Sequence, residues 1–379
     1  MCFRLPPANR VALLVALITL VSSLQSAAAQ TYFAAPTPVR VLLAVVPFVD
    51  VEATGAHHGA VGNQRFSTRT GLSWPVTASE GMLYVDGHEL AETLTIAADA
   101  GTLGVLGRHY RGAIRLSAVG EQVEVVNVLD LESYLRGVVP SEMAASWPME
   151  ALKAQAVAAR SYTLVSLDAS ARYDLCATVD CQVYRGVEAE QPRSDAAIAA
   201  TAGVVVTYGG LTARTYYHSD SGGTVASSRE VWGSSIPYLV ALQDVPSSTP
   251  HRAWTTRLDA GTLTASLDAA GLGVGTVGSL RVVAISESGR VAELEVSGSA
   301  GSRVLRGRQL NSLARGWGLK SMRFSVQGGL TVRGDGWGHG VGMSQYGARA
   351  LALAGYDYGR ILGYYYPRTS LTRFVAGAP

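Results

Sequence analysis

The chain has 379 residues, of which 31 are Lys or Arg and 29 are Asp or Glu, giving a formal net charge of +2. Residues 1–29 hold two Arg and no acid, so without them the balance is 29 − 29 = 0. A neutral chain has no long-range attraction to nucleic acid or to an anionic membrane surface, which argues against both as main partners. A ligand must therefore be bound by a shaped site.

The first 29 residues are typical of an export signal. Arg4 and Arg10 flank a short apolar run at residues 11–20, and three alanines at 27–29 provide a cleavage site. The run is too short to cross a bilayer comfortably. We therefore expect an exported, extracytoplasmic protein that meets a membrane only if this segment is retained as an anchor.

The remaining chain of about 350 residues is long enough for two domains. Up to about residue 126, apolar and β-branched runs broken by Gly and polar turns predict strands. Residues 279–298 predict a β-hairpin turned at Ser288 and Gly289, and residues 308–318 a short helix. Residues 332–367 predict a loop followed by two helices, the first of which stops at Gly355.

These patterns predict an α+β fold with a mixed catalytic body. The expected order is a signal peptide at 1–29, a β-rich N-terminal part at 30–125, and a first segment of the body at 126–245. A small β-rich inserted domain at 246–328 and a second segment of the body at 329–370 follow.

The segment GVVPSEMAASWPMEALKAQAVAARSYTL, residues 137–164, presents one carboxyl group near a helix. It predicts a turn that carries Glu142 and runs into an Ala-rich helix, with Ser146 as N-cap and Pro148 and Glu150 in the first turn. Partial burial raises the pKa of such a carboxyl and nearby cations lower it, which suits a general acid/base. The alternative is a first-turn acid that favours the helix N-terminus, although Glu150 already has that position.

Lys153 and Arg160 are two helical turns apart and therefore share a face. They are candidates to bind a ligand carboxylate or to position Glu142. The ordinary explanation of such a pair is a solvated charged stripe.

Two glycine-rich loops are candidate substrate-binding segments. The first carries His218, Ser219 and Ser221, but it lacks the Gly-x-Ser-x-Gly spacing of a nucleophile elbow. We interpret it as backbone that closely approaches a ligand. In the second loop glycines alternate from 334 to 342 without a dinucleotide fingerprint. There Trp337 is expected to stack on a sugar ring and His339 to donate a hydrogen bond, unless the loop is only a tight corner with a buried His339.

Cys176 and Cys181 remain after the predicted signal is removed. Two close cysteines in an exported protein predict a disulfide. The rival is half of a zinc site, which needs further ligands. No histidine lies between positions 109 and 218, so the disulfide is favoured.

Four segments together resemble the stage II sporulation protein D/LytB family of cell-wall proteins: residues 125–164, 181–186, 216–239 and 336–355. The resemblance implies a lytic transglycosylase that acts on peptidoglycan glycan strands stripped of peptide stems, with Glu142 as acid/base. It also implies that Lys153 and Arg160 match basic family positions and that the two glycine-rich loops, with Gln345, line the groove.

The same resemblance leaves an alternative. The family includes amidase enhancers, so the chain could instead bind the wall without cutting it and stimulate a cell-wall amidase as partner. Some members bind zinc beside the cysteine pair with flanking histidines, whereas here Asp180 precedes Cys181 and local histidine is absent. We therefore expect no cofactor and a location in the cell wall.

Overall fold

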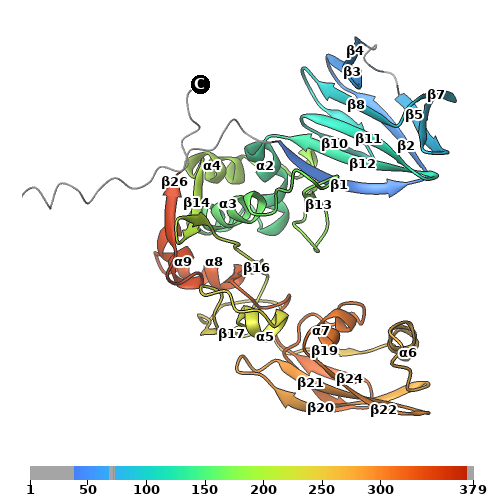
Figure 1. The fold of residues 1–379 in the computed structure, drawn as a ribbon. Coiled ribbons are helices and arrows are strands. Elements are labelled where there is room, and N and C mark those ends of the chain that lie inside the picture. Colours follow the sequence, from blue (N-terminus) through green and yellow to red (C-terminus); the bar gives the residue numbers. More distant parts are fainter. Residues whose placement is uncertain (1–37, 68–70, 72, 374–379) are drawn as a thin grey trace, which may run out of the picture. The chain divides into compact units, whose positions relative to one another are not determined.

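The computed structural model describes residues 38–67, 71 and 73–373. The predicted export signal at 1–29 lies outside the described residues. Among those that are described, no helix is long and apolar enough to cross a membrane. Helices and strands alternate irregularly (Figure 1), and the predicted α+β class is confirmed.

Two antiparallel sheets form the N-terminal part. One has the order β13-β1-β12-β11-β8-β3-β4 and the other β10-β9-β2-β5-β6-β7. In β2 every second side chain is buried, as expected for a strand with one face on a core. The bounds are β1 Val39–Val46, β2 Phe48–Ala53, β3 His57–Val61, β4 Gln64–Ser67, β5 Ser73–Ser79, β6 Met82–Val85, β7 His88–Ala91, β8 Thr93–Ala98, β9 Leu103–Val105, β10 Arg108–Tyr110, β11 Ala113–Val119, β12 Gln122–Leu129 and β13 Leu175–Cys176.

The helical body is built around α3, Met149–Leu164, which contacts α2, α4, α8, α9 and β14. Its alanines at 151, 154, 156, 158 and 159 are completely buried, and such small side chains let neighbours approach closely on several sides. The other elements are α2 Leu131–Glu142, η1 Val187–Ala189, α4 Pro192–Ala200, β14 Val204–Tyr208, β15 Leu211–Thr212, β16 Tyr217–His218, β17 Thr224–Val225, α5 Ser228–Trp232, β18 Leu242–Gln243, β25 Met343–Ser344, α8 Gln345–Leu353, α9 Tyr358–Tyr365 and β26 Ser370–Arg373.

The predicted turn around Glu142 is wrong. Helix α2 begins after the N-cap Asp130 and continues through Pro140 to Glu142, its last residue. A proline inside a helix removes a hydrogen bond and strains the preceding turn, and here the helix ends two residues later. The predicted N-cap Ser146 is also wrong, because Pro148 caps α3 without a side-chain hydrogen bond.

A second hydrophobic cluster lies between Trp254 and Val332 and is separate from the main core. The predicted β-hairpin is present, with Gly289 at φ +75° in its turn, and helix α7 starts one residue before the predicted segment. The elements are β19 Trp254–Arg257, α6 Ala260–Ala269, β20 Val277–Ile285, β21 Val291–Gly298, β22 Gly301–Arg306, α7 Gly307–Arg315, β23 Phe324–Gly328 and β24 Thr331–Gly334. The boundaries 246 and 328 stay a prediction.

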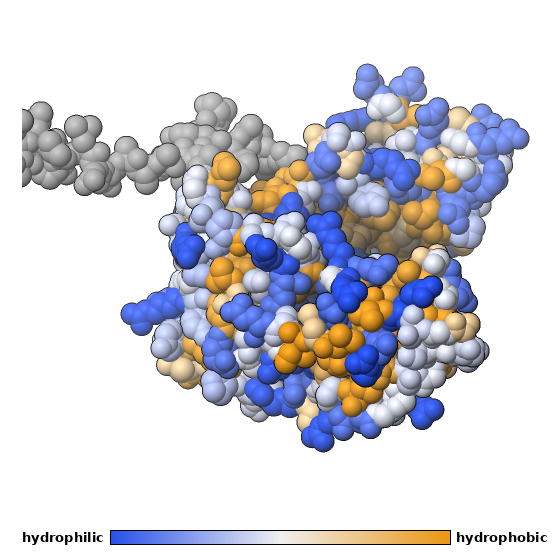
Figure 2. Space-filling model, turned by 60° about the horizontal axis from the view of Figure 1, so that its bottom comes forward, coloured by the Kyte–Doolittle hydropathy of each residue, from blue (hydrophilic) through white to orange (hydrophobic). Residues whose placement is uncertain are grey.

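Hydrophilic and hydrophobic residues are interspersed on the face shown in Figure 2. The whole chain carries nearly balanced charge, so attraction to a ligand depends on local features.

Candidate functional site

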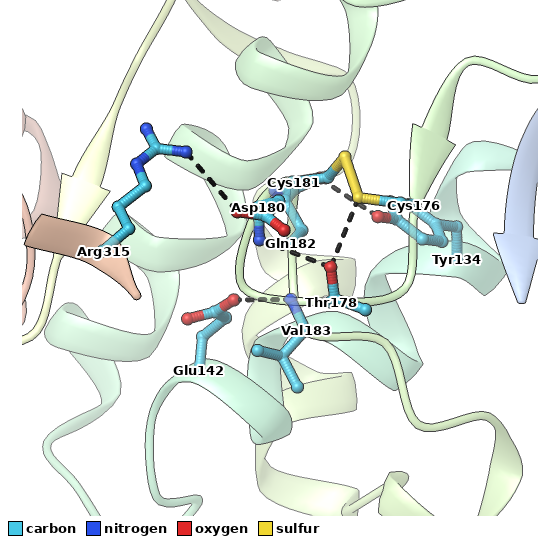
Figure 3. Close-up of a disulfide and its surroundings, with 9 residues drawn as sticks. All are labelled: Tyr134, Glu142, Cys176, Thr178, Asp180, Cys181, Gln182, Val183 and Arg315. Carbon is cyan, nitrogen blue, oxygen red and sulfur yellow. Dashed lines mark hydrogen bonds and ion pairs between the residues drawn. A yellow bond between two sulfur atoms is a disulfide. The ribbon is translucent and has the colours of Figure 1, made fainter. Parts of the chain in front are cut away.

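The carboxyl group of Glu142 is held by two segments that are distant in sequence. Its Oε1 accepts a hydrogen bond of 2.8 Å from the main-chain N–H of Val183 (Figure 3). Its Oε2 accepts one of 3.3 Å from Nε2 of Gln345, the first residue of α8. The side chain remains partly exposed. The structure thus brings together the α2 motif, the cysteine loop and the second glycine-rich loop.

Burial raises the pKa of Glu142 above its ordinary value. The Val183 N–H, the Gln345 amide, the Tyr217 hydroxyl and the charge of Arg185 act in the opposite direction, but burial outweighs them. The end of α2 carries the partial negative charge of the helix dipole, which also disfavours an ionised carboxylate. None of the groups with the largest effects on this pKa is a carboxylate. Glu142 is therefore a lone acid that keeps its proton to higher pH than usual.

A disulfide between Cys176 and Cys181 closes the loop that precedes Val183. Gln182 follows Cys181 and is buried, and both the oxygen and the nitrogen of its side-chain amide form hydrogen bonds. Its Oε1 accepts hydrogen bonds from Tyr134 and Thr163, and its Nε2 donates one of 2.9 Å to the Tyr217 hydroxyl. Figure 3 shows this loop with Glu142 beside it. The disulfide and Gln182 together position the N–H that Glu142 accepts.

The cysteine pair does not fit a zinc site. Its two sulfur atoms are bonded to each other, and the adjacent Asp180 forms an ion pair of 3.5 Å with Arg315. Within residues 38–67, 71 and 73–373, no group of three or more His, Cys, Asp or Glu side chains is placed to hold a metal ion. No step of the chemistry below uses a metal.

Two candidates of the first glycine-rich loop are buried. His218 is 4% exposed and donates from Nδ1 to the carbonyl of Val341. Ser221 is completely buried, and its hydroxyl donates to Asp244. Nδ1 of His218 and the hydroxyl of Ser221 are engaged within the protein, whereas Nε2 of His218 has no hydrogen-bond partner among the described residues. Their contact with substrate stays a prediction. Ser219 stays partly exposed, and its carbonyl accepts the N–H of Tyr346.

The second glycine-rich loop is paired with the first by main-chain bonds between Asp220 and Trp337. Gly338 adopts φ +105°, and a Cβ there would lie 2.9 Å from the Cβ of His218, so this close approach requires glycine. Trp337 is 47% exposed, with the Lys320 ammonium 5.3 Å from its ring centroid. Its side chain is thus available to a ligand.

The side chain of His339 lies in a tight corner of the second glycine-rich loop, which was the alternative expectation for it. Its ring packs beside Trp232 and His218, and its Nδ1 accepts the N–H of Val341. Burial, assisted by the charge of Arg290, lowers the pKa of His339 to about 4. A neutral ring whose Nδ1 accepts a hydrogen bond carries its proton on Nε2, so the donor role of His339 toward substrate stays a prediction.

Lys153 and Arg160 each form an ion pair with a carboxylate other than Glu142. Lys153 pairs with Glu150 at 2.7 Å. Arg160 is 1% exposed, forms two hydrogen bonds to Glu132 and donates to the carbonyl of Val204. The protein itself thus uses the Arg160 guanidinium, and its contact with substrate stays a prediction.

The surface beside Glu142 has two hollows that sequence reasoning missed. The larger, of about 490 Å³, is lined by residues that include Pro140, Ser141 and Ala145. The smaller, of about 280 Å³, is lined by residues that include Val183 and Tyr184. Both are also lined by Arg108 and Arg185. Arg185 lies in the 181–186 segment that the sequence had singled out, whereas nothing in the sequence marked Arg108.

Comparison with known proteins adds relatives along most of the chain. The family described as "Stage II sporulation protein" matches residues 119–208, and a domain of unknown function matches residues 247–342. Stage II sporulation protein D of Bacillus subtilis (strain 168) is 32% identical over 270 residues, which are 65% of this chain and 76% of that protein.

Two further relatives show the same level of similarity. An uncharacterized protein of Brachyspira hyodysenteriae is 30% identical over 69% of this chain and 71% of its own length. The amidase enhancer of Bacillus subtilis is 32% identical over 63% of this chain, but the match spans only 40% of the enhancer.

Proposed function

The chain belongs to the stage II sporulation protein D family, and we propose that it is a lytic transglycosylase that cleaves peptidoglycan glycan strands. The family membership supports a cell-wall-related, extracytoplasmic role. The proposed substrate is the strand from which peptide stems have been removed, and Glu142 is the proposed acid/base.

The reaction exchanges one bond at the anomeric carbon of the muramoyl sugar for another. The bond from C1 to the bridging oxygen breaks, and the protonated Glu142 gives its proton to that oxygen. The sugar's own 6-hydroxyl oxygen then bonds to C1, and its proton passes to the Glu142 carboxylate. The products are a 1,6-anhydro end and a new 4-hydroxyl end, so no water is consumed and the acid returns to its starting state.

The observation that carries this proposal is the state of Glu142: a lone, partly exposed carboxyl whose pKa is raised by burial, beside two hollows. Hydrolytic glycosidases generally need two carboxyl groups, one as acid and one as base or nucleophile. An attacking hydroxyl that belongs to the same sugar is held in place by the ring, so proximity replaces the second carboxyl group. A single proton carrier then suffices.

The test is mass spectrometry of peptide-stripped glycan after incubation with purified protein. The wild type is expected to release fragments with 1,6-anhydro ends, and Glu142→Gln to lose about 100-fold to 10,000-fold of that rate. Glu92→Gln, which changes an exposed acid of the N-terminal part, serves as the matched control and should cleave normally. If Glu142→Gln releases anhydro fragments at the wild-type rate, Glu142 is not the acid/base. If the wild type gives fragments with reducing ends instead of anhydro ends, the enzyme is a hydrolase and not a transglycosylase.

The second candidate function is stimulation of a cell-wall amidase, which is favoured by the similarity to the amidase enhancer. It predicts that the purified protein cleaves no glycan but raises the turnover of an added N-acetylmuramoyl-L-alanine amidase. Under this function Glu142→Gln stimulates as well as the wild type does. The two activities are therefore separated by one variant in two assays.

A further inference from the structure

Arg108 and Arg185 form a pair of cations at the surface beside Glu142. Both are exposed, both line the two hollows, and one guanidinium nitrogen of Arg108 lies 3.4 Å from the carbonyl oxygen of Arg185. In the part of the chain that the structure describes, neither forms an ion pair. By contrast, nearby Arg111 and Arg136 both pair with Glu190.

The larger hollow also holds one acid, Glu188, which forms no ion pair with either arginine in the described structure. Glu188 instead accepts hydrogen bonds from the ring and the main-chain N–H of His109, at 2.7 and 2.9 Å. Two guanidinium groups therefore remain available to an anionic ligand. Guanidinium is well matched to carboxylate, because its planar fork of N–H groups can bind both oxygens at once.

The hairpin that carries Arg108 also supplies an apolar side chain to the smaller hollow. Leu106, between β9 and β10, adopts φ +53° and is 40% exposed. Leu106 and Gly107 form the two-residue turn of this hairpin, and both have positive φ, as a type I′ turn requires. Leu106 lines the smaller hollow together with both arginines. The hollow thus combines an apolar wall with cations, which suits a ligand that has an acyl or methyl group beside an anion.

Each hollow is lined by a residue that adjoins Glu142 in the chain or contacts its carboxyl group. Ser141, next to Glu142 in the chain, lines the larger hollow, and Val183, which donates to Glu142, lines the smaller. The charge of Arg185 also acts on the Glu142 carboxyl, where it lowers the pKa. A ligand on the arginine pair would therefore lie within electrostatic reach of the acid.

Building on the proposed function, we infer that Arg108 and Arg185 form a subsite for a carboxylate of the glycan strand. That carboxylate has two sources: the lactyl ether of the muramoyl sugar, which is free once its peptide stem is removed, and the stem's own carboxyl groups. A strand of N-acetylglucosamine alone has neither.

The subsite couples binding to the proton carrier. A carboxylate on Arg185 neutralises the cation that favours ionised Glu142, so the acid keeps its proton to higher pH when such a strand is bound. A strand without carboxylates leaves that cation uncompensated. Carboxylate-bearing strands are therefore expected to be bound more tightly and to meet a better proton donor.

The experiment measures binding by the full-length Glu142→Gln protein, which holds strands without cutting them. Three probes of equal length are titrated: peptide-stripped glycan, the same glycan with stems, and chito-oligosaccharide. Arg185→Gln and Arg108→Gln are each added to this background. Arg303→Gln, which changes an exposed arginine of β22, is the charge-matched control.

We expect one or both carboxylate-bearing glycans to bind better than chito-oligosaccharide, and each arginine variant to weaken that preference about tenfold. The preference should also fall as salt is raised, because the pair is exposed. Tighter binding of the stripped glycan identifies the lactyl carboxylate as the source, and tighter binding of the glycan with stems identifies the stem.

Equal affinity for all three probes, or an equal loss for all three in the arginine variants, overturns the subsite. Circular dichroism of each variant separates loss of the subsite from loss of folding. Because these titrations require no bond cleavage, the subsite can stand where the wild type cleaves no glycan. Conversely, cleavage can stand where the arginine variants bind normally, so the two proposals fail separately.

Discussion

Gln345 donates from Nε2 to Oε2 of Glu142 at 3.3 Å, although 203 residues separate them in the chain. This bond lowers the pKa of Glu142 against the larger effect of burial. Gln345→Met removes the donor with little change of volume, so the pKa of Glu142 should rise further. The alkaline limb of the cleavage rate should then move to higher pH, with kcat changed more than KM.

The readout is a pH profile of kcat on stripped glycan. A merely structural role for Gln345 predicts a uniform drop in rate and an unmoved limb. Gln345→Glu is a second test of the contact between residue 345 and Glu142. It places another carboxyl group beside Glu142, and like-charge repulsion should raise the pKa of the pair.

The stability of the protein should report the protonation of Glu142. Its pKa is raised in the folded protein, so the proton stabilises the fold below the unfolded value of about 4.3, and this contribution is lost as pH rises through the folded value. Glu142→Gln cannot ionise and should gain stability relative to the wild type as the pH rises from the unfolded value through the folded value.

Urea unfolding of both proteins across this range measures the effect. The difference in free energy of unfolding should widen with pH for Glu142→Gln and stay constant for Glu92→Gln. A constant difference for both variants would mean that burial does not disfavour the ionised form of Glu142.

The disulfide should matter for activity through Val183. In Cys176→Ser/Cys181→Ser the loop is no longer closed, and stability should fall by about 2 kcal/mol. The Val183 N–H should then be held less firmly, which weakens a bond that lowers the pKa of Glu142. We expect kcat to fall about tenfold, in line with a loss of 1–2 kcal/mol for one hydrogen bond.

Reductant provides the control. It should reduce the rate of the wild type toward that of the double serine variant and leave that variant unaffected. An effect of reductant on the double serine variant would point to some cause other than this disulfide.

Local patterns predicted the elements that local chemistry determines. The hairpin at Gly289, helix α7 and the stop of α8 before Gly355 follow from turn residues and periodicity within one segment. Glu142 was predicted in a turn because a proline two residues earlier usually ends a helix. Helix α2 instead continues through Pro140 near its end and includes Glu142. The α+β class needed only the sum of such segments.

The environment of each candidate residue depended on partners far away in the chain. Spacing correctly identifies Lys153 and Arg160 as two turns apart, but whether a helix face is covered depends on what packs there. For Arg160 the cover is Glu132 and Val204, which are 28 and 44 residues away. Arg108 became a candidate only because folding places β10 beside the segment after the disulfide.

Arg160 should contribute strongly to the stability of the fold. Arg160→Met leaves the buried carbonyl of Val204 without its donor and removes the ion pair to Glu132, so the free energy of unfolding should fall by about 3 kcal/mol. Lys153→Met loses a partly exposed pair with Glu150, and its cost should stay below about 1 kcal/mol. Denaturant titration compares the two.

Kinetics of the folded fraction separates this role from substrate binding. Below the unfolding transition, Arg160→Met should keep the KM of the wild type. A raised KM with unchanged stability would identify Arg160 as a ligand contact.

Trp337 should bind the sugar chain through the exposed part of its ring. Its main chain, which pairs with Asp220, is independent of the side chain, so Trp337→Ala should leave the fold intact. Removal of an exposed aromatic surface worth about 1 kcal/mol should raise KM about fivefold to tenfold at nearly constant kcat.

Trp337→Phe keeps an aromatic ring and should recover much of the affinity. Tyr356→Ala removes another exposed ring, on the segment after α8, and should change neither constant. An unchanged KM in Trp337→Ala would mean that the strand passes elsewhere, and a kcat that falls with KM constant would mean that Trp337 acts on the Glu142 site.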